Sequence, residues 1–342
     1  MHISGSELAQ FELREVLGEG ADFQVFAGRH LDTGADVVFK RPHPTLVSRN
    51  QHQEVEAAIH DLARIRSELN GEIPHTPVPL SLSGPAIHDS LFGDSLGHEY
   101  TVIVESRARG VPLVGSVVDG VRKHPIGLPM NLFCLNPLRP HTSRGESQVF
   151  LDILETVEAF FQIGYLSMDV RPQNVFISPK TDEVSIIDVS DFRQPREATR
   201  RHPPLDINDM LLDLFRWYVP ANDPPPDLDS WAQYTEPLRS PHFERGVDDT
   251  RSLFSIEELT DDRELAMSVL DRIKARDFSG VSDFRACVEG IIELRKQRIM
   301  SSPAHLEQME LWRQGIAMMR CDYWGKFLFS SEPDLLAYAG TD

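Results

Sequence analysis

The residues best suited to catalysis lie in one short central stretch. Residues 167–177 read SMDVRPQNVFI, and an aspartate, Asp188, follows the next apolar run, VSII. Phosphoryl transfer needs a carboxylate that orients the attacking hydroxyl and accepts its proton, and Asp169 suits that role. It also needs hard oxygen ligands for Mg²⁺, which Asn174 and Asp188 can supply. Arg171 adds a cation that can stabilise the transferring phosphate.

A second set of candidate residues lies near the start of the chain. Residues 11–40 read FELREVLGEGADFQVFAGRHLDTGADVVFK, and their apolar periodicity predicts three strands joined by turns. Glycine in the turn Gly18-Glu19-Gly20 lets the backbone approach a phosphate chain closely. Val25 would then cover one face of an adenine, and Lys40 would reach the phosphates. An ordinary tight hairpin is the alternative explanation of this turn.

Two further elements are expected to complete a nucleotide site. Residues 51–69 show an apolar stripe at helical spacing, beside which a glutamate can pair with Lys40. Glu56 is the first choice and Glu54 the second, and the alternative is that both are solvated surface charges. The strand predicted over 98–105 ends at Glu105, whose backbone is expected to bond the edge of an adenine at a hinge.

The rest of the chain is predicted to be mostly helical. A helix is expected over 149–166, ending at Gly164, and further helices over much of 255–300. The Pro-, Gly- and Arg-rich residues 114–146 predict an irregular insertion, either a solvated loop or a source of positive charge for the site. Residues 220–229 form a proline-rich acidic connector.

Apolar and aromatic residues gather in the last forty positions. At helical spacing or in a cluster stand Leu306, Met309, Trp312, Ile316, Met319, Tyr323, Trp324, Phe327, Leu328 and Phe329. Such a stripe either covers its own domain or binds a partner. The intramolecular role is expected, because apolar stripes are usually core.

Composition excludes several classes of function. The chain has 342 residues and a formal charge of −19, so bulk attraction to nucleic acid or anionic lipid is not expected. No run of apolar residues is long enough to span a membrane, and the first residues lack the pattern of a secretory signal. The scattered thiols Cys134, Cys287 and Cys321 have no metal-ligand spacing, and the cytoplasm is the expected compartment.

Taken in chain order, these motifs resemble the protein kinase superfamily, in particular its bacterial serine/threonine kinases. The resemblance runs from Phe11 to about Tyr218 and includes Val38-Phe39-Lys40. It implies an α+β, bilobal protein-kinase-like fold with a small β-rich N-lobe over 1–105 and a larger, mainly helical C-lobe over 106–300. Residues 301–342 would form a C-terminal helical extension.

The resemblance also implies ligands and roles for individual residues. ATP and Mg²⁺ would be the cofactors, Asp169 the catalytic aspartate, and Asn174 with Asp188 the metal ligands. Gly18, Glu19, Gly20, Val25, Val38, Lys40, Glu56 and Glu105 would bind the nucleotide. Asp206 would be a buried acid in the first turn of a helix over 206–218.

The sequence departs from the family pattern at several positions. Phe23 replaces the third loop glycine, Ser167-Met168 the usual His-Arg pair, and Val189-Ser190 the usual Phe-Gly. The segment between Asp188 and Asp206 is short, which reduces the surface on which protein kinases hold a peptide.

Three functions therefore stay open. An active kinase is expected, because Lys40, Asp169, Asn174 and Asp188 are all present. Its acceptor would be a protein serine or threonine, with a small-molecule hydroxyl as the rival. A nucleotide-binding pseudokinase and a scaffold are the alternatives.

Overall fold

The computed structural model has a mixed α+β architecture and divides into two compact units, Met1–Ala108 and Arg109–Asp342. The sequence predicts its first boundary at residue 105, and the division in the structure falls after Ala108. The structure describes residues 7–69, 73–119, 122–128, 133–135, 149–178, 183–189, 191–199, 203–220, 242–254, 261–303, 306, 307, 310 and 324.

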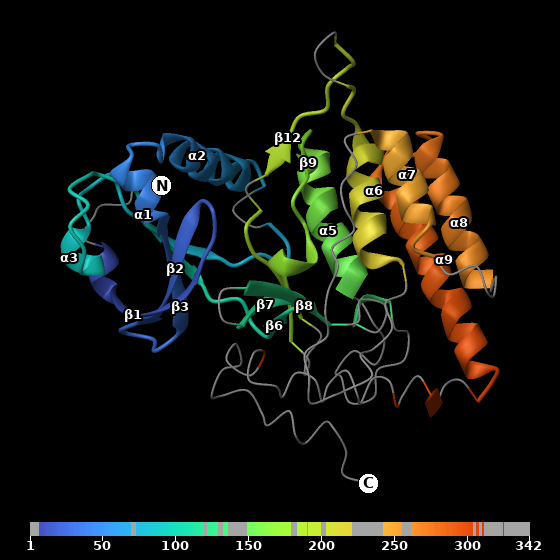
Figure 1. Cartoon of the computed structure of the whole chain (residues 1–342), viewed down its shortest axis with the longest axis horizontal. Coiled ribbons are helices and arrows are strands. Elements are labelled where there is room, and N and C mark those ends of the chain that lie inside the picture. Colours follow the sequence, from blue (N-terminus) through green and yellow to red (C-terminus); the bar gives the residue numbers. More distant parts are fainter. Residues whose placement is uncertain are drawn as a thin grey trace. The chain divides into compact units, whose positions relative to one another are not determined.

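The first unit is built on an antiparallel sheet with the strand order β1-β2-β3-β5-β4 (Figure 1). Its strands are β1 (Phe11–Glu19), β2 (Phe23–His30), β3 (Asp36–Pro42), β4 (Pro79–Leu82) and β5 (Ile103–Ser106). The meander of three strands predicted over 11–40 is present as β1, β2 and β3. Alternating apolar residues form it because successive side chains in a strand point to opposite faces.

The two faces of this sheet differ in character. Phe26, Phe39 and Val104 lie opposite one another on adjacent strands and belong to the buried core of the unit. The alternate residues Val38 and Lys40 of β3 therefore lie on the other face. One face of the sheet thus holds the core together, and the other presents the lysine.

Short helices and one long helix accompany the sheet. They are η1 (Glu7–Gln10), α1 (Pro44–Ser48), α2 (Gln53–Glu68) and α3 (Asp89–Phe92). The helix predicted over 51–69 is α2. Its N-terminal end is tied to the chain before β5, because the Thr101 N–H donates to Glu56 Oε1 at 2.7 Å and His52 Nε2 lies 3.1 Å from the Glu99 carbonyl oxygen.

Within the described residues, the second unit contains three small antiparallel sheets. They are formed by β6 (Val111–Pro112) with β10 (Val175–Ile177) and β11 (Val184–Ile186), by β9 (Leu166–Ser167) with β12 (Phe192–Arg193), and by β7 (Val114–Asp119) with β8 (Arg122–Gly127). The hairpin β7–β8 corrects the prediction of an irregular insertion over 114–146. Strand pairing organises its first part in spite of the Pro- and Arg-rich composition.

The other described elements of the second unit are helical. They are α5 (Val149–Gln162), the 3₁₀ turn η2 (Pro172–Asn174), α6 (Ile207–Tyr218), α7 (Phe243–Arg251), α8 (Asp261–Lys274) and α9 (Val281–Met300). In Figure 1, α5 to α9 lie beside one another, and α6 contacts α7, α8 and α9. The helix expected over 149–166 ends earlier than predicted, and Gly164 follows it with a positive φ of 85°. In the described parts of the chain, no helix is both long and apolar enough to cross a membrane.

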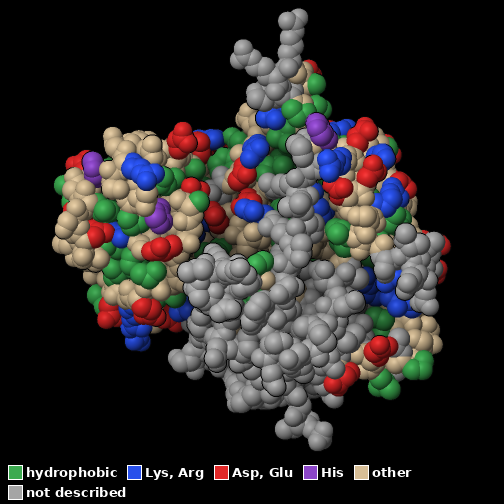
Figure 2. All heavy atoms as spheres, viewed as in Figure 1, with side chains coloured by type: hydrophobic (Ala, Val, Ile, Leu, Met, Phe, Trp, Pro, Cys, Tyr) green, Lys and Arg blue, Asp and Glu red, His purple; other side chains and the backbone are tan. Residues whose placement is uncertain are grey.

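Exposed ion pairs join neighbouring helices of this unit. Arg251 on α7 pairs with Asp271 on α8, and Lys274 Nζ lies 3.3 Å from Asp248 Oδ1. Figure 2 shows basic and acidic side chains interspersed over this face. The net negative charge of the chain is therefore not concentrated on this face. Exposed ion pairs of this kind add little to stability.

Asp206 does not have the buried position that was expected for it. It is the N-cap of α6, where its side chain accepts from the Asn208 N–H at 2.7 Å, and 38% of the side chain is exposed. Asp209 completes a capping box by accepting from the Asp206 N–H. Arg276 Nη1 lies 2.5 Å from Asp206 Oδ2, so an arginine after α8 neutralises the acidic start of α6.

One aromatic residue of the C-terminal extension is described, and it is fully buried. Trp324 is 0% exposed, and its Nε1–H donates to the Pro112 carbonyl oxygen on β6 at 3.0 Å. This contact lies within the second unit. Trp312, Tyr323 and most other members of the predicted aromatic cluster lie outside the described residues, as do residues 221–229 of the predicted connector.

Candidate functional site

In the first unit, the predicted nucleotide-binding residues of the sheet share one face. Val25 on β2 lies opposite Lys40 on β3, and Val38 lies opposite Glu105 on β5. Val25 and Lys40 are partly exposed, whereas Val38 is buried. An apolar patch beside a lysine suits a ligand with a flat apolar part and an anionic part.

The partner of Lys40 differs from the one predicted. Lys40 Nζ lies 2.7 Å from Glu105 Oε2, and the two side chains are 15% and 8% exposed. Glu56 instead accepts the hydrogen bond from Thr101, while Glu54 is exposed on α2. The pleat explains this pairing, because Lys40 and Glu105 are diagonal neighbours on the same face of adjacent strands.

Glu105 also differs from its predicted role at a hinge. It lies inside the sheet, paired with Val38 of β3 on one side and Pro79 of β4 on the other. Its backbone therefore takes part in the sheet, and its side chain lies on the same face as Lys40. The ladder ends nearby, where the Ser106 N–H donates to the Val78 carbonyl oxygen.

The glycine-rich turn between β1 and β2 is open. Gly18 and Gly20 are exposed, and the Gly20 N–H donates to the Phe23 carbonyl oxygen at 2.8 Å. A Cβ added at Gly18 would meet no heavy atom within 4 Å. Packing within the protein therefore does not require glycine at position 18, which leaves room for a ligand above the turn.

In the second unit, Asp169 is held by two neighbours on its own loop. Arg171 Nε lies 2.6 Å from Asp169 Oδ1, and its Nη2 donates to Oδ2 at 3.2 Å. The Asn174 side-chain amide donates to the Asp169 carbonyl oxygen at 3.0 Å and to Oδ2 at 3.1 Å. The carboxylate is 17% exposed, so it is oriented and still reachable.

The hairpin β10–β11 brings Asn174 and Asp188 close together in the fold. Val175 pairs with Ile186, and the Ile187 N–H donates to the Asn174 carbonyl oxygen at 2.8 Å. Asp188 follows with a φ of 57°, a left-handed conformation that aspartate tolerates better than most residues. Two oxygen-bearing side chains suited to Mg²⁺ thus flank the open end of this hairpin. Ser190 lies outside the described residues.

Contacts from outside the loop fix its backbone. The Tyr218 hydroxyl, at the end of α6, donates to the Val170 carbonyl oxygen at 2.8 Å. The Met168 N–H donates to the Asp191 carbonyl oxygen at 2.8 Å, and Ser167 pairs with Phe192. Hydrogen bonds therefore fix the backbone on both sides of Asp169, at Met168 and at Val170.

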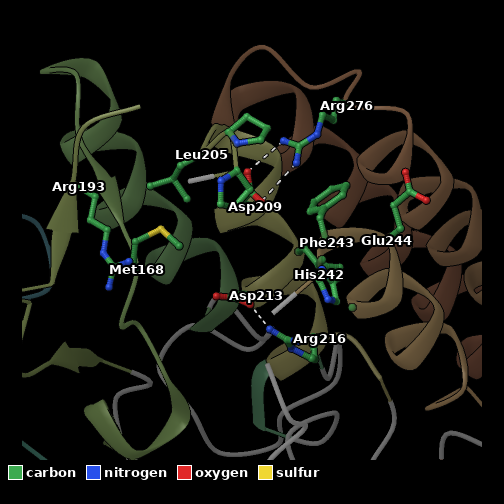
Figure 3. Close-up of a pocket in the computed structure, with 14 residues that line it drawn as sticks. Met168, Arg193, Leu205, Asp209, Asp213, Arg216, His242, Phe243, Glu244 and Arg276 are labelled. Carbon is green, nitrogen blue, oxygen red and sulfur yellow. Dashed lines mark hydrogen bonds and ion pairs between the residues drawn. The ribbon is translucent and has the colours of Figure 1, made fainter. Parts of the chain in front are cut away.

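A cavity of about 920 Å³ lies next to this loop, within the second unit. Figure 3 shows Met168 and Arg193 on one side of it, Phe243 and Glu244 on the other, and acidic side chains of α6 between them. Hydrogen bonds to Asp191 raise the pKa of Arg193, and the carboxylates of Asp169 and Asp213 act in the same direction.

The cavity is chemically mixed. Arg276 donates to both oxygens of Asp209 at 3.0 and 3.4 Å, and Arg216 pairs with Asp213 (Figure 3). These pairs neutralise much of the local charge, and Met168, Leu205 and Phe243 add apolar surface. Its size is in the range of small-ligand cavities, about 300–1,000 Å³.

Comparison with known proteins adds no relative. No protein-family model matches the sequence, and no curated protein matches it. The chemistry of the site therefore has to be argued from its own residues.

Sequence reasoning missed several residues that shape the site. Glu105 was expected to act through its backbone, and no role was expected for Arg66, whose Nη2 lies 3.9 Å from Glu105 Oε1. Tyr218 was assigned only to a helix, although a tyrosine at the end of an apolar helix is a signal that its hydroxyl meets a buried acceptor. The cavity beside Met168 had no signal in the sequence.

Proposed function

We propose that the chain is an ATP-dependent phosphotransferase with a bilobal protein-kinase-like fold, which moves the γ-phosphoryl group of ATP to a hydroxyl. The observation that carries the proposal is the constraint on Asp169, whose carboxylate is oriented by Arg171 and Asn174 on a loop that Tyr218 anchors. An oriented and accessible carboxylate is what a hydroxyl nucleophile needs as its proton acceptor.

Each part of the reaction has a candidate group. Asn174 and Asp188 would hold Mg²⁺, which bridges and neutralises the phosphates when it is bound. In the first unit, Val25 and Val38 would contact the base, Lys40 the phosphates, and the turn Gly18-Glu19-Gly20 would cover them. The proposal requires Lys40 and Asp188 to act on the same nucleotide.

The acceptor is most simply a serine or threonine of a protein. Arg171, which pairs with Asp169, is 35% exposed and can turn toward the transferring phosphate. Paired charges and apolar side chains in the adjoining cavity suit one or two side chains of an extended segment.

A small-molecule hydroxyl is the second candidate acceptor. The cavity supports it, because a volume of about 920 Å³ next to the Met168–Asp169 peptide is large enough to take a whole small substrate. The short segment between Asp188 and Asp206 also favours a small-molecule acceptor, since it leaves little surface on which to hold a peptide.

The test is transfer of label from γ-³²P-ATP with Mg²⁺ to the protein itself, to a generic basic protein and to a cell extract. We expect Asp169→Asn to lower the rate of transfer by roughly 10²–10⁴-fold, the usual contribution of a positioned acid–base group. Asp248→Asn is the matched control, since that exposed carboxylate lies on α7 and pairs with Lys274.

The outcomes separate the candidate functions. Label on a protein supports the first acceptor, and label only on small molecules supports the second. ATP binding without transfer would identify a nucleotide-binding pseudokinase. Equal transfer by wild type and Asp169→Asn would refute the assignment of Asp169.

A further inference from the structure

Three charged side chains of the first unit form a buried cluster that the proposed reaction does not explain. Lys40 approaches Oε2 of Glu105 at 2.7 Å, and Arg66 approaches Oε1 of the same carboxylate at 3.9 Å. The side chains of Arg66 and Glu105 are only 9% and 8% exposed. Buried charges are costly unless they are paired, and here the Glu105 carboxylate has a cation near each of its two oxygens.

Arg66 is held in place independently of Lys40. It lies in the last turn of α2, and both its Nη1 and its Nη2 donate to the Pro77 carbonyl oxygen at 3.2 Å. Burial lowers the pKa of Arg66, and the Glu105 carboxylate offsets part of that effect. A guanidinium remains charged at neutral pH even so.

The distribution of charge has a consequence for a bound anion. Two cations, Lys40 and Arg66, approach the one carboxylate of Glu105. Because Lys40 and Arg66 approach different oxygens of Glu105, Lys40 can turn to a phosphate while the charge of Arg66 stays 3.9 Å from the carboxylate. Without Arg66, a buried and unpaired carboxylate would stand beside the phosphates and repel them.

We propose that Glu105 positions Lys40 in place of a glutamate from α2, and that Arg66 is the counter-charge that makes this carboxylate compatible with an anionic ligand. The part concerning Glu105 stands on the geometry of the first unit alone. The part concerning Arg66 rests on the proposed function, because it needs a bound nucleotide.

The role of Glu105 is tested without any nucleotide, by the rate at which an N-hydroxysuccinimide acetate reagent acylates Lys40, followed by mass spectrometry. The reagent attacks the neutral amine, which a neighbouring carboxylate disfavours. We expect Glu105→Gln to raise acylation of Lys40 by roughly three- to tenfold relative to Lys274, an exposed internal reference. Glu54→Gln and Glu56→Gln should leave the ratio unchanged. A rise in either of these variants, with none in Glu105→Gln, overturns the assignment.

The role of Arg66 is tested by the Kd of Mg-ATP, measured by calorimetry. Arg66→Gln and Arg66→Lys both lose the two-pronged contact with Pro77, but only Arg66→Gln loses the charge. We expect Arg66→Gln to raise the Kd of Mg-ATP by about tenfold and Arg66→Lys to keep a Kd near that of wild type. The double variant Arg66→Gln/Glu105→Gln should recover most of the affinity that Arg66→Gln loses. Equal increases in Arg66→Gln and Arg66→Lys would show a merely structural role and overturn the proposal.

Failure of the proposed function is distinguishable from failure of this inference. A wild type that does not bind Mg-ATP refutes the nucleotide site and with it the role of Arg66. The acylation rates still decide whether Glu105 positions Lys40. Thermal unfolding of each variant identifies those that no longer fold, and Arg66→Lys is the variant that keeps the test valid if Arg66→Gln does not fold.

Discussion

The hydroxyl of Tyr218 offers a direct test of how the fold supports the candidate catalytic loop. Tyr218 is 0% exposed, and its hydroxyl donates to the Val170 carbonyl oxygen at 2.8 Å. Tyr218→Phe removes one oxygen atom and leaves the ring in its contact with Phe150, whose centroid is 5.2 Å away. The carbonyl then loses this donor in a place that water does not readily reach.

The size of the effect follows from that geometry. A buried polar group that loses its partner costs about 1–3 kcal/mol, more than the net value of an ordinary hydrogen bond. For a domain of roughly 150–250 residues, each kcal/mol lowers Tm by about 2–4 °C. We therefore expect Tyr218→Phe to lose about 1–3 kcal/mol of unfolding free energy. Because Val170 lies between Asp169 and Arg171, kcat should fall more than the affinity for ATP.

Urea unfolding followed by circular dichroism and by tryptophan fluorescence measures this loss, with an unchanged m-value as the sign that the folded state is intact. Tyr165→Phe is the control, since Tyr165 is partly exposed and water can replace what its hydroxyl loses. A loss below about 0.5 kcal/mol in Tyr218→Phe, the usual range of a surface change, would refute the reasoning. So would a loss equal to that of Tyr165→Phe.

Two further predictions concern residues that bear on the site. Trp324→Ala should destabilise the second unit by about 3–5 kcal/mol in a urea titration, because a fully buried indole and its bond to Pro112 are lost; near-neutral stability would contradict this anchor. Gly110→Ala should yield little folded protein by circular dichroism, since Gly110 has a φ of 82° and an added Cβ would lie 1.8 Å from the Ile177 carbonyl oxygen. Gly18→Ala, in contrast, should fold normally and only weaken the binding of Mg-ATP measured by calorimetry. Equal folding of the two glycine variants would contradict the second prediction.

Local patterns in the sequence were enough for much of the architecture. The strands β1, β2 and β3 and the helix α2 lie close to where periodicity and turn residues predict them. These elements depend on neighbours within a few residues, so the pattern that forms them is visible in the chain itself. The hydrogen bonds from Asn174 to Asp169 are also local, since they span five positions.

Partners that come from distant parts of the chain were predicted less well. The sequence offered Glu56 and Glu54 on α2 as partners of Lys40, but the register of β3 against β5 brings Glu105 to it. Asp206 was expected to be buried, yet it caps α6 and meets Arg276, seventy positions later along the chain. Local sequence patterns do not decide which partner a charged side chain takes. The energies of competing ion pairs depend on distance and burial, which the local pattern does not set.

The sequence by itself determined which chemistry the chain can carry: a carboxylate, an amide and a second carboxylate in one central stretch, with a lysine at the end of an early strand. Only the tertiary structure decided how those groups are held. It paired Glu105 with Lys40, anchored the candidate catalytic loop through Tyr218 and formed a cavity beside Met168. The physical reason is that residue type and spacing set what a side chain can do, whereas its partners are set by contacts between segments far apart in the chain.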